Sequence, residues 1–390
     1  MIRSLPPVTA WSSALIAALI GFGGTVALVV QAMRAMGASV AQTGSAVTAL
    51  CLGIAVTGAA LSVRLRMPIV LAWSTPGAAL LATSTAGASW PVAVGAFVTA
   101  GAMTVTLGAI PALERLAARI PASVASAMLA GVLLPFCIGL FLQAQTNYAL
   151  VALVLAVFLI GRVRTPLYAL PMALAAGLAF TLLRGEVGPM PPGDIIATLA
   201  PVLPRFEGGA ILSLSLPLFL VTLVSQNLPG LVVLRSAGYA PRPGGLLVGM
   251  GFASMIAAPF GAHAVNLAAI TAALCTSGDA HPEKEGRWVV GLIYAGFYLA
   301  LAAFSPALVR FFLALPHGVI ATLTGIALIP ALSGAVDAML ADKEDRDAAT
   351  LTFLATGSGL TLLGLGAAFW GLVIGFAALG IKRLLRRSPT

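Results

Sequence analysis

Long apolar runs, separated by short polar connections, occupy most of the chain. Some of these runs reach the ~20 residues that a helix needs to cross a membrane, and others are shorter. The pattern predicts an all-α polytopic membrane protein with about 14 transmembrane segments, seven in each half. The first seven lie at about 9–31, 40–62, 67–84, 90–112, 122–143, 147–161 and 166–183. The second seven lie at about 210–234, 243–258, 259–276, 288–309, 311–333, 348–365 and 367–381.

A polar stretch divides the two sets of segments. We expect residues 1–184 to form a first repeat and residues 185–209 to connect it to a second repeat. The second repeat would comprise residues 210–390 and end in a short basic tail.

The third segment is interrupted by the stretch "LAWSTPGAALLA" at 71–82. Ile69–Trp73 is rich in β-branched and aromatic residues, which favours a short strand. Thr75 followed by Pro76 indicates a helix start, with a hydroxyl at the N-cap and proline at the first helical position. The following helix of about nine residues extends roughly 13 Å, about half the thickness of a bilayer core.

The tenth segment, within Ala253–Cys275, has the same kind of interruption. A short apolar run meets Pro259, Phe260 and Gly261, and we expect a helix to begin around Ala262 and His263. Because each break falls in the third segment of its half, the pattern predicts 7+7 inverted repeats with a binding site between the two breaks.

The first segment of each half is also unusual. Gly21, Gly23 and Gly24 surround Phe22, whereas the eighth segment contains Gln226 and Asn227 shortly before a proline. A buried amide without a partner costs roughly 1–3 kcal/mol. These two amides therefore either bond across helices or contact a substrate, and their place opposite the two breaks favours substrate or site-shaping contacts.

His263 is the one histidine predicted well inside a segment. A single histidine in an apolar interior is either a hydrogen-bonded structural group or a functional one, and its place at the second break favours function. Asn266 follows at i+3 and would face the same side of a helix.

The composition supports a membrane protein, with 60% hydrophobic and 8% charged residues and a mean hydropathy of +1.05. The net charge of +9 is a topology signal: all but four of the 21 basic residues fall on one face of the predicted segments. This asymmetry predicts that both termini are cytoplasmic. The four exceptions are Arg34, Arg184, Arg205 and Arg310.

The segments lack the parts of an enzyme. All twelve acidic residues fall in or beside connections, and Asp337 is expected at an interface. The sequence has no metalloprotease or nucleophile-elbow motif and no Cys/His ligand cluster, so we expect neither catalysis nor a metal or cofactor. The three cysteines lie far apart in apolar runs, which is typical of packing residues.

Four stretches resemble the benzoate:proton symporter (BenE) family, and the resemblance extends over nearly the whole chain. They are "AWSTPGAALL" at 72–81, "SQNLPGLVVLRSAGY" at 225–239, "FGAHAVNLAAITAA" at 260–273 and "TFLATGSGLTLLGLGAAFWGLVIG" at 352–375. The resemblance implies import of benzoate or a related aromatic carboxylate with protons across a bacterial inner membrane. It also implies kinship with the uracil-permease fold, in which seven plus seven segments form a core and a gate domain. Transporters of this fold often form homodimers.

That wider family binds its substrate between the third and tenth segments, with help from the first and eighth. The resemblance therefore implies substrate-binding roles for a defined set of residues. They are Ser74, Thr75, His263 and Asn266, with Phe22, Gly23, Gln226 and Asn227 nearby. Uracil permeases carry glutamates on the eighth and tenth segments, where this chain has amides and His263; an acid there would repel a carboxylate.

A mechanism follows from the predicted half-helices. Backbone N–H groups near Thr75–Gly77 and Gly261–His263 would hold the carboxylate oxygens, because helix N-termini attract anions. Phe22, Trp73 or Phe260 would pack on the ring. The proton has two routes, on His263 or on the carboxyl group of the substrate itself.

Two other functions fit the same pattern. One is a transporter of this fold for a nucleobase, an inorganic anion or an aliphatic acid. The other is a passive anion channel, which could not accumulate its ion against a gradient.

Overall fold

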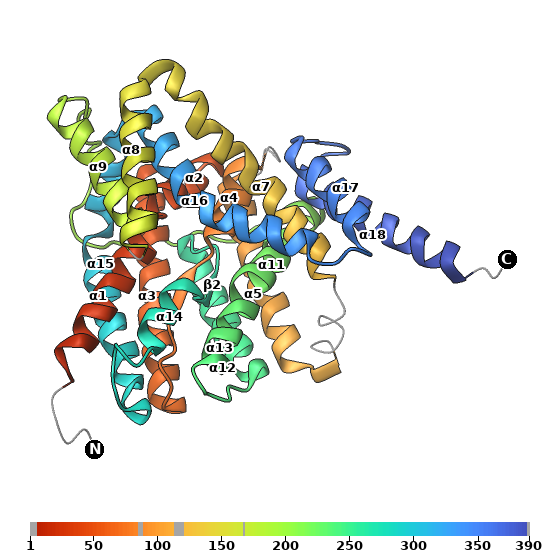
Figure 1. Ribbon diagram of the computed structural model, residues 1–390, viewed down its shortest axis with the longest axis horizontal. Helices are drawn as coiled ribbons and strands as arrows, with labels where there is room; N and C mark the ends of the chain where they lie inside the picture. The colour runs from red at the N-terminus through yellow and green to blue at the C-terminus, as the bar shows by residue number, and fades with distance from the viewer. Residues whose placement is uncertain (1–5, 85–88, 113–120, 167, 388–390) are drawn as a thin grey trace.

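Residues 6–84, 89–112, 121–166 and 168–387 are described by the structure, a computed structural model, and most of them are helical (Figure 1). The predicted cytoplasmic residues Arg3, Arg115 and Arg119 and the predicted connection residue Glu114 lie outside these ranges. The helices of the first half are α1 Val8–Gly23, α2 Val26–Ala35, α3 Val40–Leu65, α4 Thr75–Thr83, α5 Trp90–Ala109, α7 Ala122–Leu142, α8 Ala144–Arg164 and α9 Ala169–Leu183.

The second half begins with a nearly continuous helix, Gly208–Ser236, in which two π-helical turns interrupt the α-helical hydrogen bonding. Its parts are α10 Gly208–Ala210, π-turn Ile211–Ser215, α11 Leu216–Thr222, π-turn Leu223–Asn227 and α12 Leu228–Ser236. The remaining helices are α13 Pro243–Ala257, the 3₁₀ turn Ala258–Phe260, α14 Ile270–Thr276, the 3₁₀ turn Lys284–Gly286, α15 Trp288–Ala314, α16 His317–Leu340, α17 Arg346–Gly357 and α18 Ala367–Arg387.

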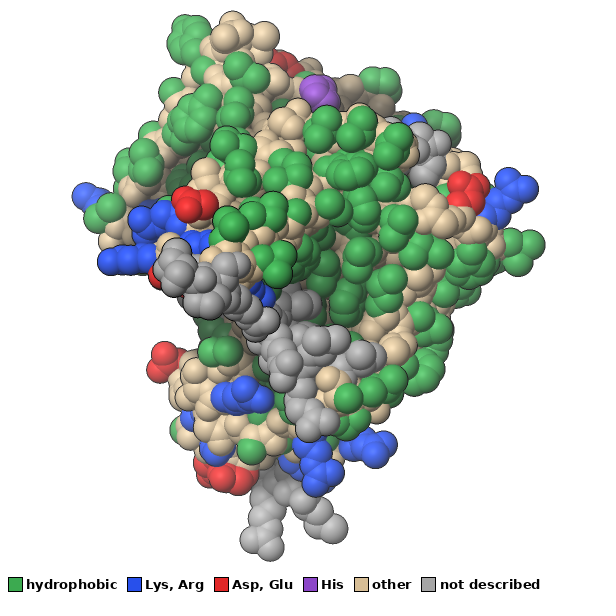
Figure 2. All heavy atoms as spheres, turned by 90° about the vertical axis from the view of Figure 1, so that its right-hand side faces the viewer, with side chains coloured by type: hydrophobic (Ala, Val, Ile, Leu, Met, Phe, Trp, Pro, Cys, Tyr) green, Lys and Arg blue, Asp and Glu red, His purple; other side chains and the backbone are tan. Residues whose placement is uncertain are grey.

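Ten helical stretches among the described residues are long and apolar enough to cross a membrane. Each predicted segment coincides with one of these stretches or with one of the shorter helices α4, α9, α14 and α17. Figure 2 shows one face with a broad field of hydrophobic side chains and with charged side chains gathered toward its margins. Such a surface suits contact with lipid, and the chain is a multi-pass membrane protein.

The helices pack as two groups. One group contains α7, α8, α9, α16, α17 and α18, which pack on one another; the other contains α1–α5 and α10–α15 (Figure 1). Helix α7 contacts α4, α11 and the second π-turn, so the short helix α4 lies at the boundary between the groups.

A two-stranded antiparallel ribbon lies inside the second group. Strand β1, Leu71–Trp73, pairs with β2, Val265–Leu267, in a register that places Ala72 opposite Asn266. Both strands pack against α3 at glycines. A Cβ on Gly53 would lie 2.9 Å from Val265 Cγ2 in β2, and one on Gly58 would lie 3.4 Å from Ile69 O, just before β1, and 3.7 Å from Leu71 Cγ. The absent side chains therefore let α3 approach the ribbon.

The connecting segment lies along the second group of helices. Backbone N–H groups of Ala197 and Val202 donate to Ala303 O at 2.8 Å and to Pro259 O at 2.7 Å. The Arg310 guanidinium donates to Pro191 O and Gly193 O, both at 2.5 Å. These bonds fix the segment to α15 and to the 3₁₀ turn after α13.

The structure corrects the predicted start of the second short helix. Gly261 adopts a left-handed conformation with φ of 99°, and the chain then extends as β2 before α14 begins at Ile270. The prediction that a helix begins around Ala262 and His263 is wrong. The sequence signal for a break was correct, but pairing with β1 keeps the chain extended beyond it.

Two smaller boundaries also differ. The N-cap of α4 is Ser74 and not Thr75, because the Ser74 hydroxyl accepts the Gly77 N–H at 2.9 Å. Helix α15 continues to Ala314, past the predicted end at about 309, since Arg310 reaches out to the connecting segment and does not end the helix.

Candidate functional site

The ribbon brings the two breaks into direct contact through His263 and Ser74. His263 Nε2 lies 3.0 Å from Ser74 O, and the side chain is 1% exposed. A carbonyl oxygen can only accept, so Nε2 carries the proton of the neutral ring. Nδ1 then has a free lone pair and no hydrogen-bond partner among the described residues. The buried ring thus offers one proton-accepting nitrogen beside the start of α4.

Asn227 and Asn266 form a second contact between segments. Asn227 Oδ1 accepts the Leu267 N–H at 3.1 Å, and Asn227 Nδ2 donates to Asn266 Oδ1 at 3.2 Å. Asn227 therefore shapes the site by bonding to β2. Asn266 is 3% exposed, and its Nδ2 has no partner in the described part of the chain. Its amide is a buried, oriented donor with nothing to donate to.

Gln226 differs from its neighbour. Its side chain is half-buried and forms no hydrogen bond with any described residue. Of the two amides, one is used by the protein and the other is available to a ligand.

The two short helices present different sets of backbone N–H groups. In α4 the Gly77 N–H bonds to Ser74 Oγ at 2.9 Å, the Ala78 N–H bonds to Ser74 O at 2.8 Å, and Pro76 has none. Thr75 thus supplies the one first-turn N–H of α4 that has no acceptor in the described chain. Helix α14 begins after Ala269, which provides no side-chain cap, and the Thr271 and Ala272 N–H groups have no acceptor among the described residues.

Gly261 and Ala262 cannot act as carboxylate donors. Their N–H groups bond to Ala258 O at 2.7 Å and to Ala257 O at 3.3 Å, within the turn. A Cβ on Gly261 would lie 2.7 Å from Ala46 Cβ and 2.8 Å from Trp90 Cζ2, so this glycine permits close packing against α3 and α5. The predicted oxygen-binding role of the Gly261–His263 backbone is therefore wrong for the Gly261 and Ala262 N–H groups, whereas the His263 N–H has no acceptor among the described residues.

Aromatic residues line the first segment beside β1. Phe22 and Trp73 rings lie 5.4 Å apart between centroids, and Trp73 Nε1 donates to Thr25 Oγ1 at 2.7 Å. Thr25 Oγ1 in turn donates to Gly21 O at 2.9 Å, across the break between α1 and α2. A Cβ on Gly23 would meet no atom within 4 Å, so space remains beside it.

Thr25 was not among the predicted residues. The signal that could have found it is the need of a buried Trp73 N–H for an acceptor. Phe260 lies elsewhere: it lines an apolar groove of about 270 Å³ between α3 and α13, together with Gly53, Val56 and Ile256.

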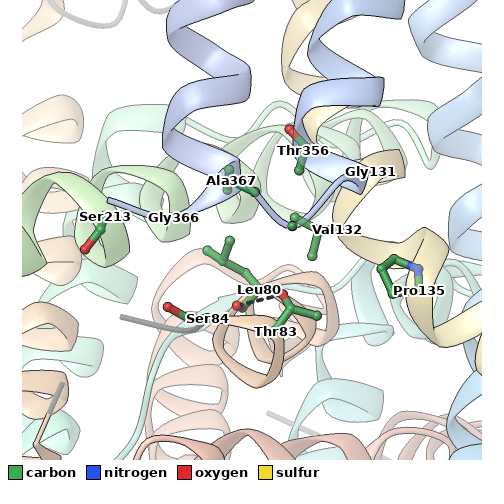
Figure 3. A pocket seen from close by; sticks show the side chains of 12 residues that line it. Leu80, Thr83, Ser84, Gly131, Val132, Pro135, Ser213, Thr356, Gly366 and Ala367 are labelled. Carbon is green, nitrogen blue, oxygen red and sulfur yellow. Dashed lines mark hydrogen bonds between the residues drawn. The ribbon is translucent and has the colours of Figure 1, made fainter. Parts of the chain in front are cut away.

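A small cavity of about 60 Å³ adjoins the other end of α4, at the boundary of the two helix groups (Figure 3). Leu80, Thr83 and Ser84 face Val132 and Pro135 of α7 across it, and the loop from α17 to α18 closes one side. None of the predicted site residues lines this cavity. The residues with hydroxyl groups that line this cavity form no recognisable sequence motif, so the sequence did not predict it.

Charge is absent from the site. None of the site residues named above is acidic or basic apart from His263. Among the described residues, no group of three His, Cys, Asp or Glu side chains is arranged to hold a metal ion. A ligand here meets dipoles and amides, with no fixed counter-ion.

Comparison with known proteins decides the family. The sequence model described as "Benzoate membrane transport protein" (BenE) matches residues 5–381. The chain belongs to the BenE family. Its predicted family is thereby confirmed, and a BenE chain is a membrane transporter and not an enzyme.

Two relatives show how far the similarity of this BenE chain extends. It is 39% identical over 377 residues to "Inner membrane protein YdcO" of Escherichia coli (strain K12), covering 95% of each chain. It is 36% identical over 363 residues to "Benzoate membrane transport protein" of Acinetobacter baylyi, covering 93% of this chain and 92% of the relative.

Solved structures with low sequence identity share the fold. The transmembrane domain of the cyanobacterial bicarbonate transporter BicA has a TM-score of 0.59 at 16% identity, covering 100% of this chain and 98% of that one. The murine anion transporter Slc26a9 in its inward-facing state has a TM-score of 0.65 at 13% identity, covering 100% of this chain and 70% of that one. The BenE chain therefore has the fold of these anion transporters.

Proposed function

We propose that this BenE chain imports benzoate or a related aromatic carboxylate together with protons, by alternating access. The observation that carries the proposal is the pairing of β1 with β2, which joins the two breaks. His263 lies beside Ser74 O at the start of α4, and Asn266 lies opposite Ala72, each with a buried polar atom that has no partner in the described chain. Family membership supplies the class of substrate, since a relative 36% identical is a benzoate transport protein.

The carboxylate would bind beside the ribbon, where polar donors lack acceptors in the described chain. These donors are the Thr75 N–H and Asn266 Nδ2. Dipoles of this kind stabilise an anion without a fixed positive charge. Gln226 is a further ligand contact, and Phe22 is the aromatic residue placed to pack against the ring. Ser74, Gly77 and Asn227 shape the site, and Gly23 leaves room beside it.

His263 is the candidate for proton coupling. Its Nδ1 can accept a proton and its Nε2–H is already bonded to Ser74 O, so a protonated ring would gain a donor. The proton then crosses either on His263 or on the carboxyl group of the substrate. With one proton per monoanion, transport is electroneutral and the pH difference alone drives uptake.

The architecture proposed for this function has 14 segments in 7+7 inverted repeats, with residues 1–184 and 210–390 as the repeats and 185–209 between them. The group α1–α5 with α10–α15 would be the core, and α7–α9 with α16–α18 the gate. The segment count and the basic residues support a bacterial inner-membrane location with both termini cytoplasmic. A homodimer is the proposed assembly.

Uptake of labelled benzoate into proteoliposomes tests the proposal. An imposed inward proton gradient should produce transient accumulation above equilibrium, and its absence should leave simple equilibration. Flux that no gradient can convert into accumulation would indicate a channel.

Competing ligands define the substrate class. The fold is shared with a bicarbonate transporter, which makes an inorganic anion the main rival. Benzoate uptake should be inhibited by other aromatic acids and not by bicarbonate, acetate or uracil. Inhibition by bicarbonate with no saturable benzoate uptake would replace the proposed substrate.

A further inference from the structure

Both outer edges of the ribbon are bonded to side chains from neighbouring helices. The Ala268 N–H donates to Val70 O at 3.0 Å, which identifies this facing pair as hydrogen-bonded within the sheet. In an antiparallel pair, hydrogen-bonded and non-hydrogen-bonded positions alternate. Residues 69 and 71 on one strand and 265 and 267 on the other therefore direct their backbone N–H and C=O groups away from the partner strand.

Four side chains bond to these outward groups. Ser62 of α3 bonds to Ile69, and Tyr294 of α15 donates to Leu71 O at 3.0 Å. Ser254 of α13 bonds to Val265, and Asn227 accepts the Leu267 N–H. We call Ser62, Tyr294, Ser254 and Asn227 the ribbon frame.

The two serines of the ribbon frame act in the same way in the two halves. Ser62 Oγ accepts the Ile69 N–H at 3.0 Å and lies 3.2 Å from Ile69 O, to which it donates. Ser254 Oγ accepts the Val265 N–H at 2.9 Å, and its proton is shared between Met250 O at 2.9 Å and Val265 O at 3.3 Å. In each half, the long helix that precedes the strand supplies the serine.

Few other hydrogen-bond partners are available to the backbone groups at the ribbon edges. Ser62 is 0% exposed and Ser254 is 5% exposed. The Ile69 N–H also lies 2.9 Å from Met67 O, whereas the Val265 N–H bonds to Ser254 Oγ and to no other described residue. A Cβ on Gly291 would lie 2.6 Å from Ser62 Oγ, so α15 closes over this serine and leaves no room beside it. An exposed sheet edge has water to bond, but a buried edge needs side chains.

We propose that Ser62 and Ser254 are positioning residues for transport: they hold the ribbon, and through it Asn266, His263 and the start of α4, in the geometry that binds the substrate. This inference rests on the proposed function for its transport consequence. Neither serine touches the substrate. Each acts on the backbone of a strand whose neighbouring residues do.

Hydrogen exchange of the ribbon tests the positioning role without any ligand. In detergent, Ser254→Ala should speed exchange of the peptide containing Val265–Leu267 about tenfold, because one net hydrogen bond of roughly 1.4 kcal/mol is a factor of ten. Ser254→Thr keeps the hydroxyl and should restore protection. Thr104→Val is the matched control, since the buried Thr104 hydroxyl bonds only to Ala100 O of its own helix.

Benzoate binding is the second measurement on the same variants. Ser254→Ala should weaken binding about tenfold while the Thr104→Val variant binds as the wild type does. Ser62→Ala should act in the same direction but less strongly, since Ile69 keeps Met67 as an acceptor. If Ser254→Ala fails to fold, Ser62→Ala and Ser254→Thr still test the frame.

The outcomes separate this inference from the proposed function. Unchanged exchange of the ribbon in both alanine variants would overturn the positioning role. Faster exchange in a protein whose wild type binds no benzoate would support the ribbon frame and refute the proposed substrate. Faster exchange with unchanged benzoate affinity would overturn the link between the frame and binding.

Discussion

The two interrupted segments have the same arrangement, a short strand followed by a short helix, but their polar groups are used differently. In the first, Ser74 caps a helix of nine residues and occupies the Gly77 N–H with its own hydroxyl. In the second, α14 has seven residues, begins after Ala269 and has no side-chain cap. The strands differ as well, because Ala72 lies opposite Asn266. In the described chain, the first break leaves only the Thr75 N–H without an acceptor in its first helical turn, whereas the second leaves several polar groups unpaired.

This difference indicates where ligand chemistry is concentrated. Asn266 Nδ2, His263 Nδ1 and the Thr271 and Ala272 N–H groups of α14 all come from the second break and lack partners in the described chain. The first break contributes the Thr75 N–H and, through Ser74 O, the acceptor that orients His263. We therefore expect changes in the second break to alter binding and coupling most strongly.

Asn266→Asp should have the largest effect. The variant replaces an unpaired buried donor with a carboxylate, which would repel an anionic substrate in a site without basic side chains. We expect benzoate affinity to fall by at least about 100-fold, as for other unpaired buried charges. Equilibrium binding of labelled benzoate measures it.

Asn147→Asp is the control for this change. Asn147 Oδ1 accepts the Leu150 N–H at 3.1 Å on α8, and an aspartate can accept the same bond. Binding should be unaffected there. Wild-type affinity in Asn266→Asp would remove Asn266 from the carboxylate site.

His263→Gln should uncouple transport from the proton gradient. A glutamine amide can still donate to Ser74 O but cannot accept a proton at neutral pH. If His263 carries the proton, an imposed gradient should no longer produce accumulation above equilibrium, and uptake with the gradient should fall to the level reached without it. Benzoate exchange without a gradient should continue.

Comparison with His317→Gln controls for loss of a histidine, because His317 begins α16 and lies away from the ribbon. Full gradient-driven accumulation in His263→Gln would assign the proton to the carboxyl group of the substrate.

Sequence patterns located both breaks because their signals are local. Proline at 76 lacks an N–H and favours a helix start, and Gly261 is the residue type that adopts a positive φ without strain. The predicted site residues Ser74, His263, Asn227 and Asn266 were brought together by the fold.

The path of the chain after the second break could not be derived in this way. Residues 265–267 are extended because β1 is available to pair with them, and that partner lies almost 200 residues away in the sequence. The contacts of Thr25 with Trp73 and of the serines with the strands are equally non-local. A helix-start signal read alone favoured Ala262, and tertiary pairing overrode it.

The smallest expected effect concerns the first break, where Thr25 and Trp73 connect α1, α2 and β1. Trp73→Phe removes the indole N–H, and Thr25→Val removes its acceptor. Each change should weaken benzoate binding about threefold, through a shift of Phe22, because a net hydrogen bond is worth about 0.5–1.5 kcal/mol.

The double variant makes this prediction decisive. If the two residues act through one hydrogen bond, Trp73→Phe with Thr25→Val should bind benzoate no more weakly than the weaker single variant. Independent effects would multiply to about ninefold. Since Thr25 also donates to Gly21 O, Thr25→Ser should preserve both bonds and wild-type affinity. Losses that multiply would show that the two residues contribute to benzoate binding through separate contacts. The first break would then contribute more to binding than its hydrogen-bonded polar groups indicate.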